Sequence, residues 1–404
     1  MQAHTNALDE GIPEIDLPSL AGQPYGTLEA LRSACPVAKA VGPDGLSMWI
    51  VTRYEDVAAG LADPRLSLDR RHAKPGQYQG LGLPPALDAN LLNMDGPHHA
   101  RLRALASKSF TPQRVETCRP MVQRVATELV EALAPLGEAD LVAAYAARLP
   151  IMVICELLGV PEPDRLDFRA WTNAILGGGR DPVAAGAAIG ALTEFLRRLI
   201  ADKRRTPADD LISDLVLARD EQGRLSEDEL TSLAFLLLFA GYENSVHLIG
   251  NSILALLDHP DQLADLLEHP DLLESAVEEL TRFEGPAPLA IRRFPTQDVR
   301  IGGTRIGQGE TVLLSLAGAN RDPERFGDPD ELDLRRSARS HLALGRGAHY
   351  CLGAPLARLE LQIAVGTVVQ GLPGLRLAVP RDEVQFRPSI RTRGLTALPV
   401  AFDA

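Results

Sequence analysis

The chain has 404 residues and a formal net charge of −13 at pH 7, and this acidic balance argues against nucleic acid as a partner. Its mean hydropathy is close to zero, and neither a long apolar run nor a signal peptide is evident, so we expect a soluble cytoplasmic protein without a membrane span. Its four cysteines have no paired spacing, which fits a reducing compartment.

The N-terminal part is expected to hold a few short elements and one long irregular segment. Residues 1–30 are polar and interrupted by Pro and Gly, which predicts a loosely ordered segment. Residues 46–52 have the pattern of a strand, and residues 54–61 that of a short helix. Residues 70–93 are rich in Gly and Pro. Such long irregular segments are usually functional or mobile, and a plain surface connector is the alternative.

Two basic side chains occupy one face of the next predicted helix. Pro97 stands in its first turn, and His99 and Arg103 are spaced i, i+4. Such a pair of donors could bind a carboxylate, since the Arg side chain can make two parallel hydrogen bonds to it. A solvated basic face is the alternative. Thr111 and Pro112 then predict the start of another helix, with Thr111 as its cap.

From there the pattern is helical to about Leu257, and it ends in one long central helix. Ser226 and Glu229 form a capping box, and the helix that follows is apolar almost all round, which predicts a core position. Its middle carries the polar run Ala240-Gly241-Tyr242-Glu243-Asn244-Ser245. The small pair would let a flat ligand approach the backbone, and the polar side chains could hold water; a structural kink is the alternative.

The C-terminal third combines helices and short strands. Glu279 and Arg282 are spaced i, i+3 in a predicted helix. Residues 290–294 and 297–301 alternate like strands, and two glycines follow at 302–303 as a turn. The predicted closing strands are 375–377 and 396–402.

A glycine-rich loop leads into an apolar helical segment from Ala354 to about Val368. The loop reads Leu344-Gly345-Arg346-Gly347-Ala348-His349-Tyr350-Cys351-Leu352-Gly353. A cysteine just before a helix start lies near the positive end of the dipole, which favours the thiolate. Such a loop could press a thiolate against a haem iron, which accepts thiolate as an axial ligand. A small buried apolar cysteine is the alternative, and no other Cys or His stands nearby at zinc-ligand spacing.

This loop resembles the cysteine-ligand signature of the bacterial cytochrome P-450 superfamily, the haem–thiolate monooxygenases. Their pattern, Phe-Gly-x-Gly-x-His-x-Cys-x-Gly, is matched at Gly345, Gly347, His349, Cys351 and Gly353. Leu344 stands where the family usually has a Phe that shields the sulfur, so this departure bears on redox tuning rather than on ligation. The resemblance extends from about Trp49 to the end of the chain.

The resemblance implies a mostly helical cytochrome P-450 fold with a small β-rich lobe, as a single domain over residues 1–404, and haem b as cofactor. Cys351 would be the iron ligand, and Glu279, Arg282 and Arg336 would form a structural network behind the loop. The implied propionate ligands are His99, Arg103, Arg293 and His349, and the other implied haem contacts are Ala240, Gly241, Leu344, Gly345 and Gly353.

The central helix resembles the family's Ala/Gly-Gly-x-Asp/Glu-Thr motif, but Asn244 stands where the family usually has Thr. In the family, the acid and the alcohol relay protons for oxygen activation, and an amide is a poor proton donor. Glu243, Asn244 and Ser245 are the implied catalytic residues. Protons are expected to come through Ser245, an ordered water or a hydroxyl group of the substrate.

The implied reaction is O₂-dependent hydroxylation or epoxidation of a medium-to-large apolar natural product in secondary metabolism. Polyketide-like macrolides are the first substrate class and cyclic dipeptides the second. Leu289, Ala290 and Ile291 are implied substrate contacts, residues 389–392 a further candidate, and residues 70–93 the implied lid of the pocket.

Electrons would come from a separate ferredoxin and its reductase. A basic patch suited to an acidic ferredoxin could be formed by Arg101, Lys108, Arg346 and Arg358. Two other functions remain open at this point: aryl or phenol coupling, or peroxide-driven oxidation, by the same haem–thiolate centre, and a haem-bound ligand sensor without turnover.

Overall fold

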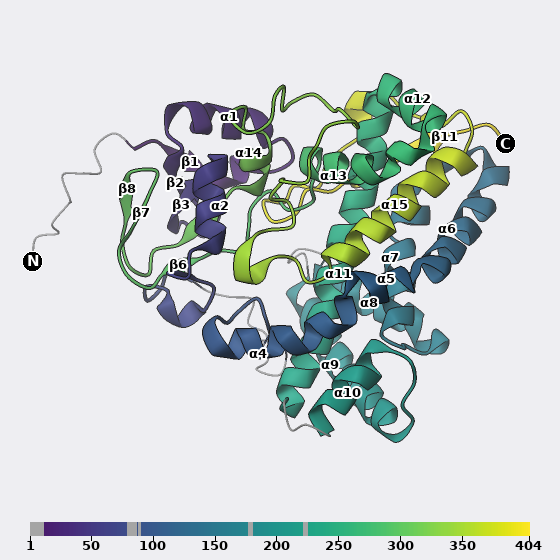
Figure 1. Ribbon diagram of the computed structural model, residues 1–404, viewed down its shortest axis with the longest axis horizontal. Coiled ribbons are helices and arrows are strands. Elements are labelled where there is room, and N and C mark those ends of the chain that lie inside the picture. Colours follow the sequence, from purple (N-terminus) through teal and green to yellow (C-terminus); the bar gives the residue numbers. More distant parts are fainter. Residues whose placement is uncertain (1–11, 79–86, 88–89, 177–180, 221–224) are drawn as a thin grey trace, which may run out of the picture.

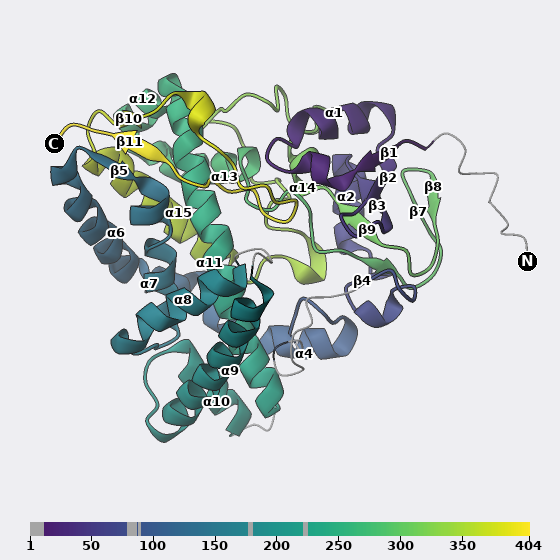
Figure 2. The ribbon, with the colours of Figure 1, turned by 180° about the vertical axis from the view of Figure 1, so that it is seen from behind.

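The computed structural model describes residues 12–78, 87, 90–176, 181–220 and 225–404. A helical body fills one side, and a smaller lobe built around a four-stranded sheet fills the other (Figure 1). Seen from behind, the long helix α11 runs through the helical body, and α13 lies between it and the lobe (Figure 2). This architecture confirms the mostly helical fold with a small β-rich lobe.

The four-stranded sheet of the lobe is covered on both faces. Its strands lie in the order β1 (Glu14–Asp16), β2 (Val37–Val41), β3 (Ser47–Val51) and β9 (Val312–Leu314). Side chains alternate across a strand, so Ile50 packs with leucines of α1 (Tyr25–Ala34), whereas Val51 packs with α2 (Tyr54–Ala62). The strand expected at 46–52 and the helix expected at 54–61 are confirmed to within one residue at each end.

The expectation of a loosely ordered N-terminal segment is wrong for residues 12–30. They form β1, a 3-10 turn at Leu17–Leu20 and the first turns of α1. Leu17, Leu20 and Leu28 are buried against the sheet face that carries Ile50. The polar composition concealed this structure because a few widely spaced leucines carry all of the packing.

The helical body holds most of the described residues. Its helices are α4 (Gly96–Ser107), α5 (Pro112–Glu116), α6 (Arg119–Leu133), α7 (Leu149–Leu157), α8 (Arg165–Leu176), α9 (Pro182–Arg205), α10 (Leu211–Asp220), α11 (Glu227–Asp258), α12 (Pro260–Glu268), α13 (Leu273–Phe283) and α15 (Ala354–Gly371). The short helix α14 (Leu316–Asn320) packs with α1 and α2 in the lobe. Thr111 caps α5 through its side chain, as expected. The helix expected after the cysteine is α15.

The helix α11 runs through the body as its core element. The capping box of Ser226 and Glu229 is present, and the helix extends to Asp258, one residue beyond the expected end. In the described part of the chain it is the one helix long and apolar enough to cross a membrane, but 71% of its apolar stretch is buried inside the protein. It packs against α7, α9 and α15, so its apolar surface serves the core.

The strands of the C-terminal third are shorter than expected. They are β6 (Phe294–Pro295), β7 (Val299–Ile301), β8 (Thr304–Ile306), β10 (Arg376–Leu377) and β11 (Pro399–Ala401), while β4 (Leu66–Ser67) and β5 (Glu138–Asp140) come from the first half of the chain. The strand expected at 290–294 is wrong in extent, because Arg293 and Leu289 form only isolated bridges with the sheet region. Of the expected lid (residues 70–93), residues 79–86 and 88–89 lie outside the described residues, and Arg70–His72 form a short 3-10 turn.

Candidate functional site

The cysteine loop (residues 344–353) joins the lobe to α15, and two glycines set its course. Gly345 and Gly347 have φ angles of 73° and 74°, a left-handed region that side chains disfavour. A Cβ on Gly347 would lie 3.0 Å from the Cα of Ala62, at the end of α2. The loop therefore packs its backbone directly on α2.

Cys351 lies just before α15, and its backbone N–H donates to the Leu344 carbonyl at 2.8 Å. Burial raises the pKa of the Cys351 thiol, although the Gly353 backbone N–H and the charges of Arg103 and Arg358 oppose this. Desolvation by burial is the largest of these effects, and the thiolate expected at the helix start stays a prediction. A bound metal cation would reverse this balance, since a coordinating thiol is deprotonated outright.

The basic face of α4 lies against the cysteine loop. The rings of His99 and His349 are 4.1 Å apart between centroids, and Arg103 donates to the Tyr350 carbonyl. His99 is buried and its Nε2 atom has no hydrogen-bond partner. Burial, followed by the charges of His349 and Arg103, lowers the pKa of His99 to about 4, so this ring is placed as a neutral donor or acceptor.

Asp95 holds the other ring of this pair and was missed by the sequence analysis. Its Oδ1 atom lies 2.8 Å from Nε2 of His349, and its Oδ2 atom accepts from Ser67 Oγ at 2.6 Å and from the Leu68 N–H at 2.7 Å. Burial alone would raise the pKa of Asp95, but these hydrogen bonds hold it well below its usual range. Asp95 stands directly before α4, and its side chain makes no cap bond to that helix.

Arg293 reaches the same region from the lobe. It is buried, one of its terminal nitrogens donates to the Leu66 carbonyl at 3.2 Å, and its Nε atom has no partner. Burial lowers the pKa of Arg293 to about 10, and the carboxylate of Asp95 partly opposes this shift. Arg293 and Asp95 therefore share one electrostatic neighbourhood with the α4 face.

These residues fit a haem. Cys351 supplies a sulfur ligand, and His99, Arg103 and Arg293 supply donors suited to two propionates. The buried unpartnered atoms of His99 and Arg293 are costly unless a hydrogen-bonding group meets them. In the ranges that the structure describes, no cluster of three or more His, Cys, Asp or Glu could hold a bare metal ion.

The middle of α11 is more open than the rest of the helix. Gly241 and Asn244 are exposed there, whereas Ala240 and Glu243 are half-buried. A Cβ on Gly241 would meet only Ile154, at 3.6 Å. The amide nitrogen of Asn244 donates back to the Ala240 carbonyl at 3.3 Å. A flat ligand could therefore lie against this turn of the helix.

Ser245 connects α11 to a buried acid on α15 that the sequence analysis also missed. Burial raises the pKa of Glu360 to about 7, and a hydrogen bond with Ser245 partly opposes this shift. One carboxyl oxygen of Glu360 has no partner. The sequence does contain a signal for Glu360, because it is a lone carboxylate in the apolar segment that follows the cysteine loop.

The expected substrate contacts lie between the two core clusters of the lobe. Leu289, Ala290 and Ile291 are all half-buried. Leu289 packs, as Ile390 does, against the cluster around α1, and Ala290 packs against the cluster around α2. Leu289 and Ala290 thus have packing roles of their own.

Glu279, Arg282 and Arg336 lie in direct contact behind the cysteine loop. Arg282 donates to both carboxylate oxygens of Glu279, each at 2.7 Å, and both side chains are fully buried. Nε of Arg336 lies 3.1 Å from the same carboxylate. Arg282 also donates to the carbonyls of Asn320 and Pro329, each at 2.8 Å. The network therefore ties α13 to the segment that leads into the loop.

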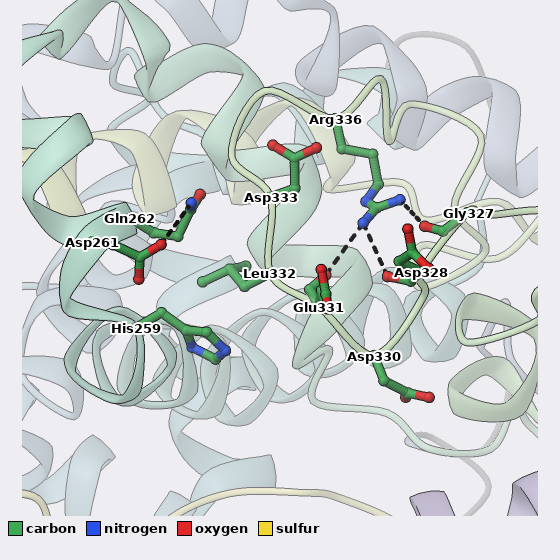
Figure 3. A pocket seen from close by; sticks show the side chains of 10 residues that line it. All are labelled: His259, Asp261, Gln262, Gly327, Asp328, Asp330, Glu331, Leu332, Asp333 and Arg336. Atoms are coloured by element: carbon green, nitrogen blue, oxygen red, sulfur yellow. Dashed lines mark hydrogen bonds between the residues drawn. The ribbon is translucent and has the colours of Figure 1, made fainter.

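Arg336 also closes the outer side of this network (Figure 3). It donates to the backbone carbonyls of Gly327, Asp328 and Glu331. The hollow beside it has a volume of about 710 Å³ and is lined by His259, Asp261, Gln262, Gly327, Asp328, Asp330, Glu331, Leu332, Asp333 and Arg336. Its acidic lining differs from the donor set around Cys351, so we treat it as a separate surface feature.

Only part of the expected basic patch consists of uncompensated charge. Arg101 pairs with Glu229, and Arg358 makes a two-point pair with Glu278. Lys108 and Arg346 are exposed. The expected patch is therefore reduced to Lys108 and Arg346, because the charges of Arg101 and Arg358 are already balanced by carboxylates.

Comparisons with known proteins agree with this geometry. A sequence profile of the family Cytochrome P450 matches residues 184–373. The chain is 46% identical over 395 residues to the cytochrome P450 monooxygenase PikC of Streptomyces venezuelae, which covers 96% of this chain and 94% of the relative. It is 42% identical over 398 residues to the mycinamicin IV hydroxylase/epoxidase of Micromonospora griseorubida, with coverage of 95% and 96%. The solved structure of the bacillaene polyketide synthase cytochrome P450 PksS of Bacillus subtilis 168 has a TM-score of 0.88 at 34% identity, with coverage of 96% of this chain and 98% of that chain.

Proposed function

Because the chain belongs to the cytochrome P450 family and is a haem-dependent monooxygenase, we propose that it hydroxylates or epoxidises a medium-to-large apolar natural product of the polyketide type. The observation that carries the proposal is the convergence of Cys351 with the donors of His99, Arg103 and Arg293 around one loop. Haem b, when bound, supplies the activation of O₂.

The residues around the cysteine loop would hold that cofactor. Cys351 would bind the iron through its thiolate, and His99, Arg103 and Arg293 would hold the propionates. His349 is oriented by Asp95 at 2.8 Å, so its contribution to propionate binding would depend on that carboxylate. The Glu279–Arg282 pair would keep the loop in place from behind.

Protons would reach the active site by a route that avoids Asn244. The amide of Asn244 is a poor proton donor, and its nitrogen is already engaged with the Ala240 carbonyl. Ser245 has a hydroxyl and touches Glu360, whose raised pKa of about 7 lets it hold or release a proton near neutral pH. Glu243 and Ser245 would therefore organise water and protons on the two sides of Asn244.

The proposed substrate class is supported by the expected substrate contacts and by the relatives. Leu289, Ala290 and Ile291 offer aliphatic surface, which suits an apolar molecule. One relative is named for the hydroxylation or epoxidation of mycinamicin IV, and one solved structure comes from polyketide synthesis. A polyketide-like substrate is thus the first choice, and a cyclic dipeptide the second.

Electrons would come from an acidic ferredoxin and its reductase, and the cell compartment would be the cytoplasm. The exposed Lys108 and Arg346 support a docking role for the loop side of α4. All four cysteines are free thiols, which fits a reducing compartment.

The first test is the difference spectrum of the reduced, carbon monoxide-bound protein. Cys351 as iron ligand requires the strongly red-shifted Soret band of a thiolate-ligated haem, and Cys351→Ala is expected to abolish it. Cys118→Ala is the matched control, because Cys118 lies before α6. A histidine-type spectrum in the unmodified protein would overturn the ligand assignment.

The substrate class is tested by titrating macrolactones and cyclic dipeptides and following the haem spin state. A spin shift with macrolactones, and a product that has gained one oxygen atom, are the expected results. A product coupled or cyclised without added oxygen would instead support the second candidate, aryl or phenol coupling, which the amide at Asn244 favours because coupling does not need the usual relay. The sensor alternative has no support among these monooxygenase relatives.

A further inference from the structure

A line of polar side chains follows one face of α11 away from the candidate active site. Glu243, His247 and Asn251 are spaced i, i+4, i+8, so they lie one above the other on the same face. The rest of α11 is largely apolar and buried. Buried polar groups in such a helix are costly unless they are paired, so this line calls for a physical reason.

His247 is held tightly at the centre of that line. It is buried, and a Cβ built on Gly394 would clash with Nδ1 of its imidazole ring. Gly394 belongs to the C-terminal turn (residues 386–395), which is closed by a bridge between Phe386 and Leu395 and by the Arg387 N–H donating to the Gly394 carbonyl at 2.8 Å. The imidazole thus has no freedom to move towards the turn.

Asn251 fastens the same turn to α11 one helical turn further on. Its side-chain nitrogen donates to the Arg393 carbonyl at 3.0 Å and to the Glu284 carbonyl at 3.2 Å. The Arg393 N–H donates to the Pro286 carbonyl at 2.7 Å. Since Arg393 is adjacent to Gly394, the backbone that confines His247 is itself fixed.

The polar end of the His247 ring faces Glu243. Nε2 of His247 lies 3.6 Å from a carboxylate oxygen of Glu243, which is slightly too long for a hydrogen bond. That nitrogen is buried without a hydrogen-bond partner. Glu243 is half-buried and has three rotatable bonds, so a small rotation of its side chain closes the gap while the imidazole stays where it is.

We propose that His247 is a positioning residue for Glu243: its Nε2–H donates to the carboxylate and selects the direction in which the acid points. This inference rests on the proposed role of Glu243 in organising protons at the active site. It also links that acid to the C-terminal turn that is expected to contact substrate, because the turn confines the imidazole. A substrate that shifted the turn would change the hold on Glu243.

The test uses two variants of the haem-loaded protein with carbon monoxide as the probe. His247→Gln can place a donor nitrogen where Nε2 lies, whereas His247→Leu removes the donor and keeps an apolar side chain. The C–O stretch of the ferrous complex is the readout, since it responds to the electric field of nearby groups and needs no substrate. Loss of one hydrogen bond to a carboxylate lowers the population of the Glu243 orientation that His247 holds about tenfold. In His247→Leu the main C–O band is therefore expected to give way to a band at another frequency. In His247→Gln the original band is expected to return.

Glu243→Gln distinguishes the proposed role of Glu243 at the active site from the positioning role of His247. The proposal is supported if Glu243→Gln moves the C–O band and if adding His247→Leu to it causes no further change. If Glu243→Gln moves the band but His247→Leu does not, or if Leu and Gln at position 247 act alike, the positioning role is overturned and the role of Glu243 stands. If Glu243→Gln leaves the band unchanged, the proposed place of Glu243 at the active site is overturned, and the inference with it.

Discussion

Glu360 shows how burial changes the chemistry of a single residue. It lies on α15 in an otherwise apolar environment, where burial raises its pKa from 4.5 to about 7. A carboxyl group with this pKa can exchange protons near neutral pH, which an exposed glutamate cannot do. In the proposed proton route, its contact with Ser245 would take the place of the alcohol that Asn244 replaces.

The raised pKa of Glu360 predicts a pH-dependent stability. Between about pH 4.5 and 7 the folded protein keeps this proton while the unfolded chain has released it, so stability falls as the pH rises through that window. Glu360→Gln is expected to remove this fall, with a gain relative to the unmodified protein that approaches about 3 kcal/mol above pH 7. Urea unfolding of both haem-loaded proteins from pH 4.5 to 8 measures it, and parallel curves would contradict the shifted pKa.

The helix α13 meets the segment that leads into the cysteine loop through the buried ion pair of Glu279 and Arg282. Glu279 and Arg282 lie on α13 with no exposed side-chain surface, and Arg336 comes from the segment that leads to the loop. A buried pair of this kind adds little net stability, but removing one partner leaves an unpaired buried charge. The pair therefore acts mainly to fix where α13 and the loop segment meet.

Arg282→Ala is expected to destabilise the protein by about 3–5 kcal/mol and to lower its haem content, because the loop loses its support. Arg335→Ala is the matched control, since Arg335 pairs with Asp265 on the exposed surface and such pairs are worth about 1 kcal/mol or less. Thermal unfolding and the haem-to-protein absorbance ratio measure both effects. Equal losses in the two variants would contradict a special role for the buried pair.

At the scale of the whole molecule, the helical body and the lobe approach each other around the cysteine loop. The loop packs on α2 of the lobe through Gly347 and on α4 through Arg103. The helix that follows it, α15, pairs with α13 through Arg358 and Glu278. Although the chain carries a net charge of −13, exposed basic residues remain at this junction. Local charge, rather than net charge, then decides where an acidic partner docks.

Reversing the charges of Lys108 and Arg346 together is expected to weaken binding of an acidic ferredoxin about fivefold or more at low salt, and the difference should shrink at high salt. Arg376→Glu, in β10 near the C-terminus, is the control. Titration calorimetry at two salt concentrations measures the affinities. An unchanged affinity in the double variant, or an equal loss in the control, would place the docking surface elsewhere.

The sequence by itself determined the local features of this protein. The strand at 46–52, the helix at 54–61 and the capping box at Ser226 depend on neighbouring residues, and all three are confirmed. The cysteine loop and the helix after it were also predictable, because glycine spacing and apolar periodicity are local signals. The ordered residues 12–30 were missed, because a few leucines far apart in the sequence form that packing.

The tertiary structure decided the groups whose chemistry depends on burial and distant partners. Asp95 orients His349, 254 residues away in the chain, and the sequence analysis did not single it out. The pKa shifts of Cys351, His99 and Glu360 come mainly from desolvation. The burial of a titratable side chain depends on elements that are distant in the sequence, so these pKa shifts could be derived only once the helices and the lobe were in place.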